Sequence, residues 1–195
     1  SYEALRKKSR GKFSMVKFAQ LKTLAKNTVG RSDAFLLKQM EITIDIENQL
    51  DAKIDEIESQ ILECIRALNP PILTIPGIGE LTAAIILSEY GNINKFENPA
   101  QLLSFAGLEP GYYQSGLAEH QGHMVKHGSS HLRYALMNAC LPLITYEPVF
   151  AEYYAKKRAE GKPHRVALTH VAKKLLRVIF TLQTKNISYD PPLIR

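Results

Sequence analysis

The sequence predicts an all-α protein in which a long coiled-coil helix precedes a compact helical domain containing a helix-hairpin-helix motif. Three observations support this prediction. Apolar residues recur at helical spacing from 36 to 68, a Pro-Gly-x-Gly turn precedes an Ala- and Ile-rich run, and no segment shows the clear alternation of a strand. We therefore expect a basic linker segment and coiled-coil helix over residues 1–71 and a second domain over residues 72–195.

The bulk composition fits one domain with an extension. The chain has 195 residues, of which 45% are hydrophobic, enough to bury a core. No apolar run approaches the ~20 residues that cross a bilayer, so we expect no membrane segment. Cys64 and Cys140 lack the spacing of a metal site or a disulfide framework, which favours a cytoplasmic location. The chain begins at Ser1 within a helical pattern, so we expect it to be a fragment.

Charge is segregated along the chain. The net charge is +6 and the pI is about 9.2. Residues 1–27 and 156–177 are basic, whereas residues 41–63 are strongly acidic. A basic balance of this kind favours a polyanionic partner such as nucleic acid.

The segment 36–68 carries the seam of a coiled coil. Its positions alternate by three and four residues and are apolar except at Thr43 and Glu47. The partner of the seam is the chain's own domain, a second copy or another domain, and we expect a homo-oligomer. Asn69-Pro70-Pro71 should end the helix, because proline lacks the backbone donor that continues it.

The stretch ILTIPGIGELTAAIILSEYG, residues 72–91, matches a helix-hairpin-helix pattern. Gly77 and Gly79 permit a tight turn, and the free N–H groups of the next helix can meet a phosphate of double-stranded DNA. A purely structural pair of helices is the alternative interpretation.

Four further helices should follow. Asn98-Pro99 caps and starts a short helix that Gly107 closes, and Ser129 or Ser130 caps a helix reaching about Leu141, where Pro142 should kink or end it. Pro148 opens another helix, and residues 164–184 form the last one, whose apolar face includes Val171, Leu175, Val178 and Leu182. Residues 108–128 between the first two should form a long loop.

Ser115 in this loop is a candidate nucleophile. Gly116 allows a substrate to approach closely. Lys126 and Arg133 supply positive charge, and Gly128 before a capped helix offers backbone donors, so together they could hold a phosphodiester beside the hydroxyl. Alternatively, Arg133 braces the fold.

A serine hydroxyl needs a base or a metal ion for activation. His120, His123 and His127 lie near in sequence, although each could equally be a surface residue. No Asp/Glu cluster with metal-ligand spacing accompanies them, so we expect no metal ligand in this chain. Tyr112 and Tyr113 are a second pair of candidate nucleophiles, or they could stack on bases or pack against helices.

The order of several blocks resembles a known family. IPGIGELTAAIILSEYG, FENPAQLLSFAGLEPGYYQSG, VKHGSSHLRYALMNAC, HRVALTHVAKKLLRVIFTL and YDPP occur in the order found in the C-terminal transposase domain of the IS-one-ten insertion-sequence family, which is related to Piv-type DNA invertases. The resemblance covers residues 72–192, and the preceding segment is similar to the linker helices of these transposases.

The resemblance implies DNA strand exchange at a two-part active site. A RuvC-like N-terminal domain would bind Mg²⁺ through four carboxylates, and Ser115 would attack a phosphodiester to form a phosphoserine link. Lys126, Gly128 and Arg133 fall on the family's Lys-x-Gly and Leu-Arg positions, and family members act as oligomers with a structured guide RNA. The acidic domain is absent from this sequence, so the fragment alone should be inactive.

Two other interpretations remain open. One is a non-catalytic helix-hairpin-helix DNA-binding module, in which Ser115 is a loop residue. The other is a coiled-coil scaffold whose basic helices meet an acidic protein surface. Salt-dependent duplex binding is expected of the transposase and of the DNA-binding module, but not of the scaffold. Covalent capture of DNA is expected of the transposase alone.

Overall fold

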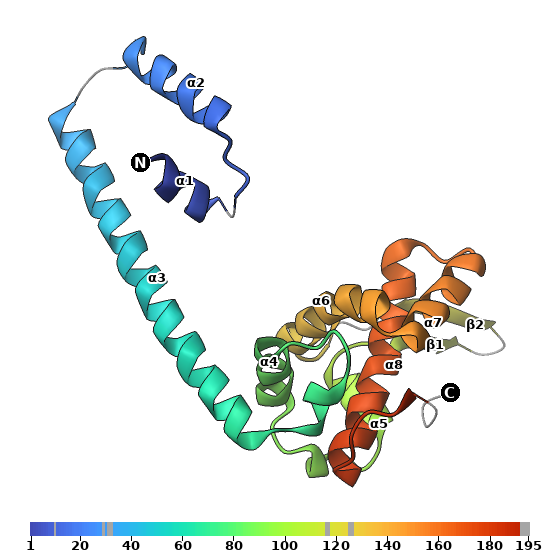
Figure 1. Ribbon diagram of the computed structural model, residues 1–195. Coiled ribbons are helices and arrows are strands. Elements are labelled where there is room, and N and C mark those ends of the chain that lie inside the picture. Colours follow the sequence, from blue (N-terminus) through green and yellow to red (C-terminus); the bar gives the residue numbers. More distant parts are fainter. Residues whose placement is uncertain (10, 29, 31–32, 116–117, 125–126, 192–195) are drawn as a thin grey trace. The chain divides into compact units, whose positions relative to one another are not determined.

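The computed structural model describes residues 1–9, 11–28, 30, 33–115, 118–124 and 127–191, and within 110–126 the description covers the backbone alone. Contacts divide the chain into two units, Ser1–Ala52 and Lys53–Arg195 (Figure 1). The all-α prediction is confirmed, with a two-stranded β-ribbon as an addition. The division falls inside the long helix, whereas the sequence places the domain boundary after Pro71, and that boundary stays a prediction.

The first unit contains α1 (Tyr2–Lys8), α2 (Met15–Lys26) and the start of α3 (Ala34–Leu68). Ser1 and Ser14 cap the first two helices by accepting from Ala4 N and Lys17 N. Lys8 Nζ lies 3.5 Å from Glu47 Oε1 on α3. Neither α1 nor α2 buries any residue, so this unit has no apolar core formed by its two short helices.

The long helix predicted over 36–68 is confirmed as α3. Its seam side chains are largely uncovered, because Leu50, Ile54 and Ile57 are 58%, 52% and 54% exposed. The helix ends before Asn69-Pro70-Pro71 as expected, and Pro71 starts a 3-10 turn, η1 (Pro71–Thr74). Pairing of the seam in a coiled coil stays a prediction.

The second unit packs around α8 (His164–Lys185), which contacts α5 (Pro99–Phe105), α6 (Ser130–Tyr146) and α7 (Pro148–Ala159). The other elements are η1, α4 (Glu80–Tyr90), which packs on α6, and a second 3-10 turn, η2 (Ile93–Lys95). The predicted apolar face of α8 is buried. None of the helices in the described ranges is long and apolar enough to cross a membrane.

Pro142 does not end α6, which continues to Tyr146. A proline within a helix frees the carbonyl four residues earlier, here that of Asn138. Asn138 is exposed, so water can satisfy this carbonyl. The expectation that Pro142 ends the helix was therefore wrong. The exposed Asn138 carbonyl can accept from water in place of the missing backbone donor.

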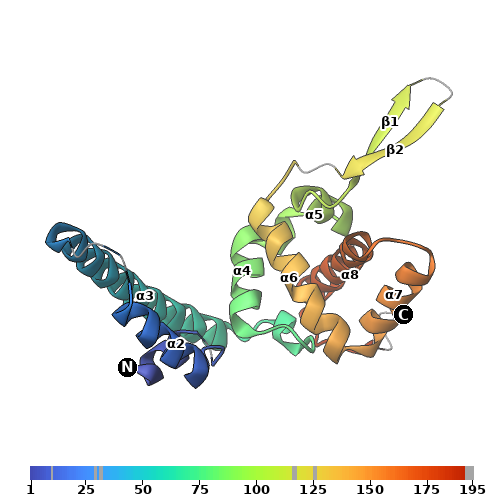
Figure 2. The same ribbon diagram turned by 90° about the horizontal axis from the view of Figure 1, so that it is seen from above.

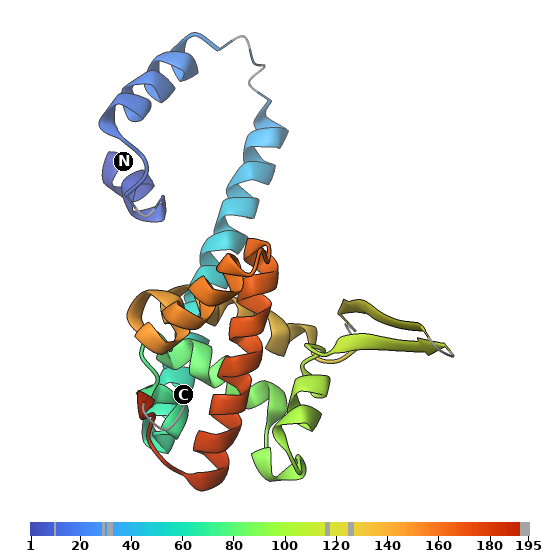
Figure 3. The same ribbon diagram turned by 90° about the vertical axis from the view of Figure 1, so that its right-hand side faces the viewer.

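Residues predicted as a long loop form an antiparallel ribbon of β1 (Pro110–Ser115) and β2 (Ala118–Met124). Tyr113 pairs with His120 and Ser115 pairs with Ala118, so Gly116 and Leu117 alone separate the strands. The ribbon extends away from the helices of the second unit (Figures 2 and 3). Ser115 therefore ends β1 at the far end of the ribbon.

The two cysteines should differ sharply in reactivity. Cys64 is exposed, whereas Cys140 is buried, and burial raises the pKa of the Cys140 thiol to about 12. Because the thiolate is the reactive form, Cys140 should stay unmodified at pH 8 in the native protein. A chromogenic disulfide reagent should titrate one fast thiol in buffer and two in denaturant, and Cys64→Ser should remove the fast phase. Two fast thiols in buffer would contradict the burial of Cys140.

Candidate functional site

The foot of the ribbon is fixed through backbone contacts with the end of α5. Gly128 has a φ of +147°, and a Cβ atom there would collide with the carbonyl oxygen of Phe105 and lie 2.9 Å from Gly107 N. The next residue, Ser129, donates its N–H to the same Phe105 carbonyl at 2.8 Å. Only glycine fits at position 128, because any side chain would push the ribbon away from α5.

Side chains at the start of α6 reinforce this attachment. The Ser129 hydroxyl accepts from Leu132 N at 2.9 Å, which caps α6, and donates to Glu89 Oε2 on α4 at 2.5 Å. Arg133 is half-buried and donates from Nη1 to the Ala106 carbonyl at 3.1 Å. Residues 129–133 thus connect α4, α5 and α6 next to the foot of the ribbon.

These contacts assign roles within the predicted phosphate-binding set. Gly128 and Arg133 both contact the end of α5, which agrees with the bracing alternative for Arg133, and their phosphate-binding roles stay predictions. Gly116 and Lys126 lie outside the described residues. Ser115 is placed by the register of the ribbon at its distal end, opposite Ala118. The distance between Ser115 and the foot is spanned by β1.

The Pro-Gly-x-Gly turn separates its two glycines into different environments. Gly77 has a φ of +87°, and a Cβ atom there would lie 2.9 Å from the carbonyl carbon of Pro142, so this glycine packs against α6. Gly79 is exposed, has nothing within 4 Å of an added Cβ, and precedes α4 as its N-cap without a side-chain cap. The first N–H groups of α4 thus have no side-chain acceptor at the N-cap, as an anion contact requires.

A carboxylate beside these donors is already paired. Arg66 donates from Nε and Nη2 to the two oxygens of Glu80, at 2.8 and 2.7 Å. The hydrogen bond from Arg66 lowers the pKa of Glu80, and the same bond raises the pKa of Arg66. Glu80 stays ionised and neutralised, so its repulsion of a phosphate at the start of α4 is reduced.

In the described part of the chain, no group of three His, Cys, Asp or Glu side chains could hold a metal ion. The expectation that this chain supplies no metal ligand stays a prediction. His127 is exposed. The side chains of His120 and His123, and those of Tyr112 and Tyr113, fall within the part described by backbone alone. Their proposed roles stay predictions.

Sequence reasoning missed the ribbon and Glu89. Gly116-Leu117 between two short runs is a pattern of two-residue hairpin turns that begin with glycine, and Tyr112-Tyr113 favours a strand. These signals could have indicated the ribbon. Glu89 carries no comparable signal, because its partner Ser129 lies 40 residues away along the chain.

Comparison with known proteins places these features in a class. Residues 69–155 match the family model described as Transposase IS116/IS110/IS902 family. The chain is 32% identical over 136 residues to the "Insertion element IS110 uncharacterized 43.6 kDa protein" of Streptomyces coelicolor, covering 69% of this chain and 34% of that protein. It is 30% identical over 151 residues to the "Pilin gene-inverting protein" of Moraxella bovis, covering 75% and 46%.

A third relative is the "Transposase for insertion sequence element IS1111A" of Coxiella burnetii, 28% identical over 157 residues, which cover 79% of this chain and 41% of that protein. The matches are thus proteins named for insertion elements, transposition and gene inversion. The chain belongs to the IS110-type family of insertion-sequence transposases, as its ordered sequence blocks indicate. It spans between about a third and a half of the length of these relatives.

The glycines should respond differently to substitution. Gly128→Ala and Gly77→Ala each place a Cβ against backbone at a positive φ, so each should lower the free energy of unfolding by about 2 kcal/mol or more. Gly79→Ala meets open space at an extended φ and should cost at most about 1 kcal/mol through the weaker N-cap. Thermal unfolding followed by circular dichroism measures all three. A Gly128→Ala protein as stable as Gly79→Ala would contradict the close packing of the ribbon foot.

Proposed function

We propose that this chain is the serine-bearing part of a DNA transposase or recombinase, with Ser115 as the nucleophile of strand cleavage and exchange. The observation that carries this proposal is the position of Ser115 at the far end of a projecting ribbon with a fixed foot. A two-stranded ribbon is narrow enough to enter a groove of duplex DNA. The family membership of the chain supports the same function.

The proposed chemistry is a transesterification. The Ser115 hydroxyl loses its proton as its oxygen bonds to phosphorus, and the bond from phosphorus to one deoxyribose oxygen breaks. That oxygen takes up a proton and leaves as a sugar hydroxyl. One phosphodiester replaces another, so the strand can be rejoined to a new partner without an external energy source.

Activation of the hydroxyl needs groups beyond those described. The resemblance implies Mg²⁺ held by a carboxylate-bearing N-terminal domain, and Mg²⁺ would supply charge stabilisation at the phosphate. The described residues do not fit this ion, because they contain no cluster of three ligands. We therefore assign no step of this chain to it.

The DNA contacts are proposed for two places. The uncapped start of α4 at Gly79 offers backbone donors to a phosphate, and Gly116 and Lys126 near the ends of the ribbon strands would meet the cleaved phosphodiester. Gly77, Gly128 and Arg133 support these contacts by holding the turn and the ribbon. The basic segments 1–27 and 156–177 suit a structured guide RNA, and the reduced state of both cysteines suits the cytoplasm.

Covalent capture tests the nucleophile. The full-length protein, incubated with Mg²⁺, guide RNA and labelled DNA bearing the element's ends, should give an adduct that survives denaturation. Ser115→Ala should reduce this adduct to background, because alanine cannot form a phosphoester, whereas Ser130→Ala on exposed α6 surface should leave it unchanged.

An adduct that persists in Ser115→Ala would assign the nucleophile to another residue, with Tyr112 and Tyr113 next in order. Salt-dependent duplex binding without any adduct would instead favour the non-catalytic DNA-binding module, which the exposed start of α4 would serve. Absence of duplex binding would leave the scaffold interpretation.

We also propose that the chain forms a homo-oligomer through α3. The exposed side chains of Ile54 and Ile57 each leave over half of their surface in contact with water, which burial between two helices would remove. Replacing both with glutamine should shift the mass measured by light scattering towards the monomer. Ser59→Ala on the same helix is the matched control and should keep the wild-type mass. A wild-type monomer would overturn the proposal.

A further inference from the structure

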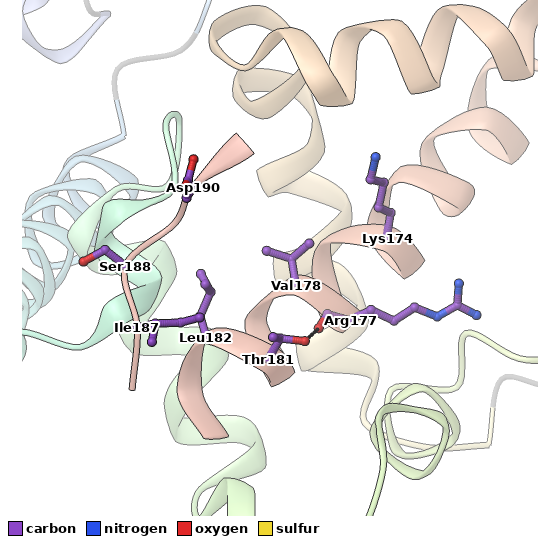
Figure 4. A pocket seen from close by; sticks show the side chains of 8 residues that line it. All are labelled: Lys174, Arg177, Val178, Thr181, Leu182, Ile187, Ser188 and Asp190. Carbon is purple, nitrogen blue, oxygen red and sulfur yellow. Dashed lines mark hydrogen bonds between the residues drawn. The ribbon is translucent and has the colours of Figure 1, made fainter. Parts of the chain in front are cut away.

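A small pocket lies between the C-terminal half of α8 and the chain that follows this helix (Figure 4). Its volume is about 240 Å³. Pockets for drug-sized ligands begin at roughly 300 Å³, so this one suits a small ligand. The pocket is lined by Lys174, Arg177, Val178, Thr181, Leu182, Ile187, Ser188 and Asp190.

The lining is divided by chemistry. Lys174 and Arg177 lie on one side, Ser188 and Asp190 on the other, with Val178 and Leu182 between them (Figure 4). Val178 and Leu182 are buried members of the apolar core. The pocket therefore offers an apolar surface with cations at one end and a hydroxyl and a carboxylate at the other.

The wall formed by the tail is held in place, although the tail has no regular secondary structure. Ile187 N donates to the Leu182 carbonyl at 3.1 Å, and Tyr189 N donates to Thr74 Oγ1 at 2.7 Å. The Tyr189 ring also stacks on Phe150, with 6.5 Å between the ring centroids. These contacts hold Ile187 and Tyr189 within the segment that closes the pocket.

The two cations are available to a ligand. Lys174 Nζ lies 5.1 Å from the ring centroid of Tyr153 and 5.5 Å from that of Phe150, which restricts its side chain. Burial lowers the pKa of Lys174, and burial together with the charge of Arg177 lowers the pKa of Lys173. Among the described residues, neither Lys174 nor Arg177 forms an ion pair with a carboxylate. Within the described ranges, no carboxylate neutralises these two charges, so they favour an anionic ligand.

We propose that this pocket binds one unpaired nucleotide of a single-stranded nucleic acid segment. The phosphate contacts Lys174 and Arg177, the base lies on Val178, Leu182 and Ile187, and the polar edge of the base faces Ser188 and Asp190. This proposal rests on the proposed function, since it specifies a form of nucleic acid that the same chain holds.

The mixture of groups selects this ligand over simpler ones. A free phosphate gains nothing from an apolar floor, and Asp190 would repel it. An apolar side chain of a protein partner gains nothing from two unpaired cations. A nucleotide uses both ends, and repulsion between its phosphate and Asp190 sets its direction. A base within a duplex cannot enter, because its faces are stacked and its edge is paired.

The test compares strands with and without bases. Fluorescence anisotropy with labelled DNA and RNA strands of about ten nucleotides should show the 195-residue chain binding at least ~5-fold tighter to base-bearing strands than to abasic strands of equal charge. Ile187→Asp should abolish this ratio; Ile187 is 37% exposed, so the fold should survive, as thermal unfolding can verify.

Charge variants separate the phosphate contact from the base contact. Arg177→Gln should weaken binding of both strand types, whereas Arg165→Gln removes the same charge from exposed α8 surface outside the pocket and should weaken both types less. Equal affinity of the wild-type chain for base-bearing and abasic strands would overturn the proposal, as would an unchanged ratio in Ile187→Asp. Preference for either sugar supports the pocket and identifies whether the strand is DNA or RNA.

The result is independent of the nucleophile. Ser115 does not line the pocket, and the base-dependent ratio is measured with strands that undergo no cleavage. If covalent capture fails while the base-dependent ratio and its loss in Ile187→Asp are observed, the pocket stands and the catalytic proposal falls. If covalent capture succeeds while the base-dependent ratio is absent, the catalytic proposal stands and the pocket proposal is wrong.

Discussion

The second unit depends on the burial of one face of α8. Nine residues of this helix are buried, and α5, α6 and α7 all pack against it. Each fully buried Leu, Ile or Val contributes on the order of 1.5–3 kcal/mol, so this face is the largest single source of order in the unit. The placement of α6 on α8 in turn sets the position of Ser129 and Arg133, which hold the ribbon. The location of Ser115 therefore depends on apolar contacts made by a helix that begins nearly fifty residues later.

The first unit has the opposite character. Its apolar side chains on α2, including Met15, Val16 and Leu24, remain exposed, and neither α1 nor α2 buries a residue. Helices of seven and twelve residues are marginal on their own, because the cost of ordering the chain exceeds what so few hydrogen bonds return. The contacts that hold them within the unit are few, such as the Tyr2–Phe18 ring pair and the Lys8–Glu47 ion pair.

Local signals predicted much of the second unit. Asn98 and Ser129 cap the helices that they were expected to start, Pro99 and Pro148 stand at the first helical positions, and the last helix has the predicted range within one residue. These features succeed because capping and proline geometry act within three or four residues. The apolar face of α8 was readable for a similar reason, since one helix repeats its pattern over 22 residues.

Most of what the sequence did not reveal depends on partners distant in the chain. The ribbon is the exception, because Gly116-Leu117 and Tyr112-Tyr113 are local signals that could have indicated its turn and its first strand. The contact of Gly77 with Pro142 joins segments 65 residues apart, and the bond between Ser129 and Glu89 spans 40. The tail wall of the α8 pocket likewise requires Thr74, more than a hundred residues upstream. Tertiary proximity, not local propensity, decides these features.

The close fit at Gly128 has a mechanical consequence. Five residue steps along β1 separate Pro110 from Ser115, which is a lever of about 17 Å at the usual strand rise. A tilt of about 3° at the foot would move the serine by roughly 1 Å, and displacements of that size can change a reaction rate on the order of 100-fold. For the nucleophile that we propose, Gly128 thus limits how far Ser115 can tilt from its position, although the two residues lie at opposite ends of the ribbon.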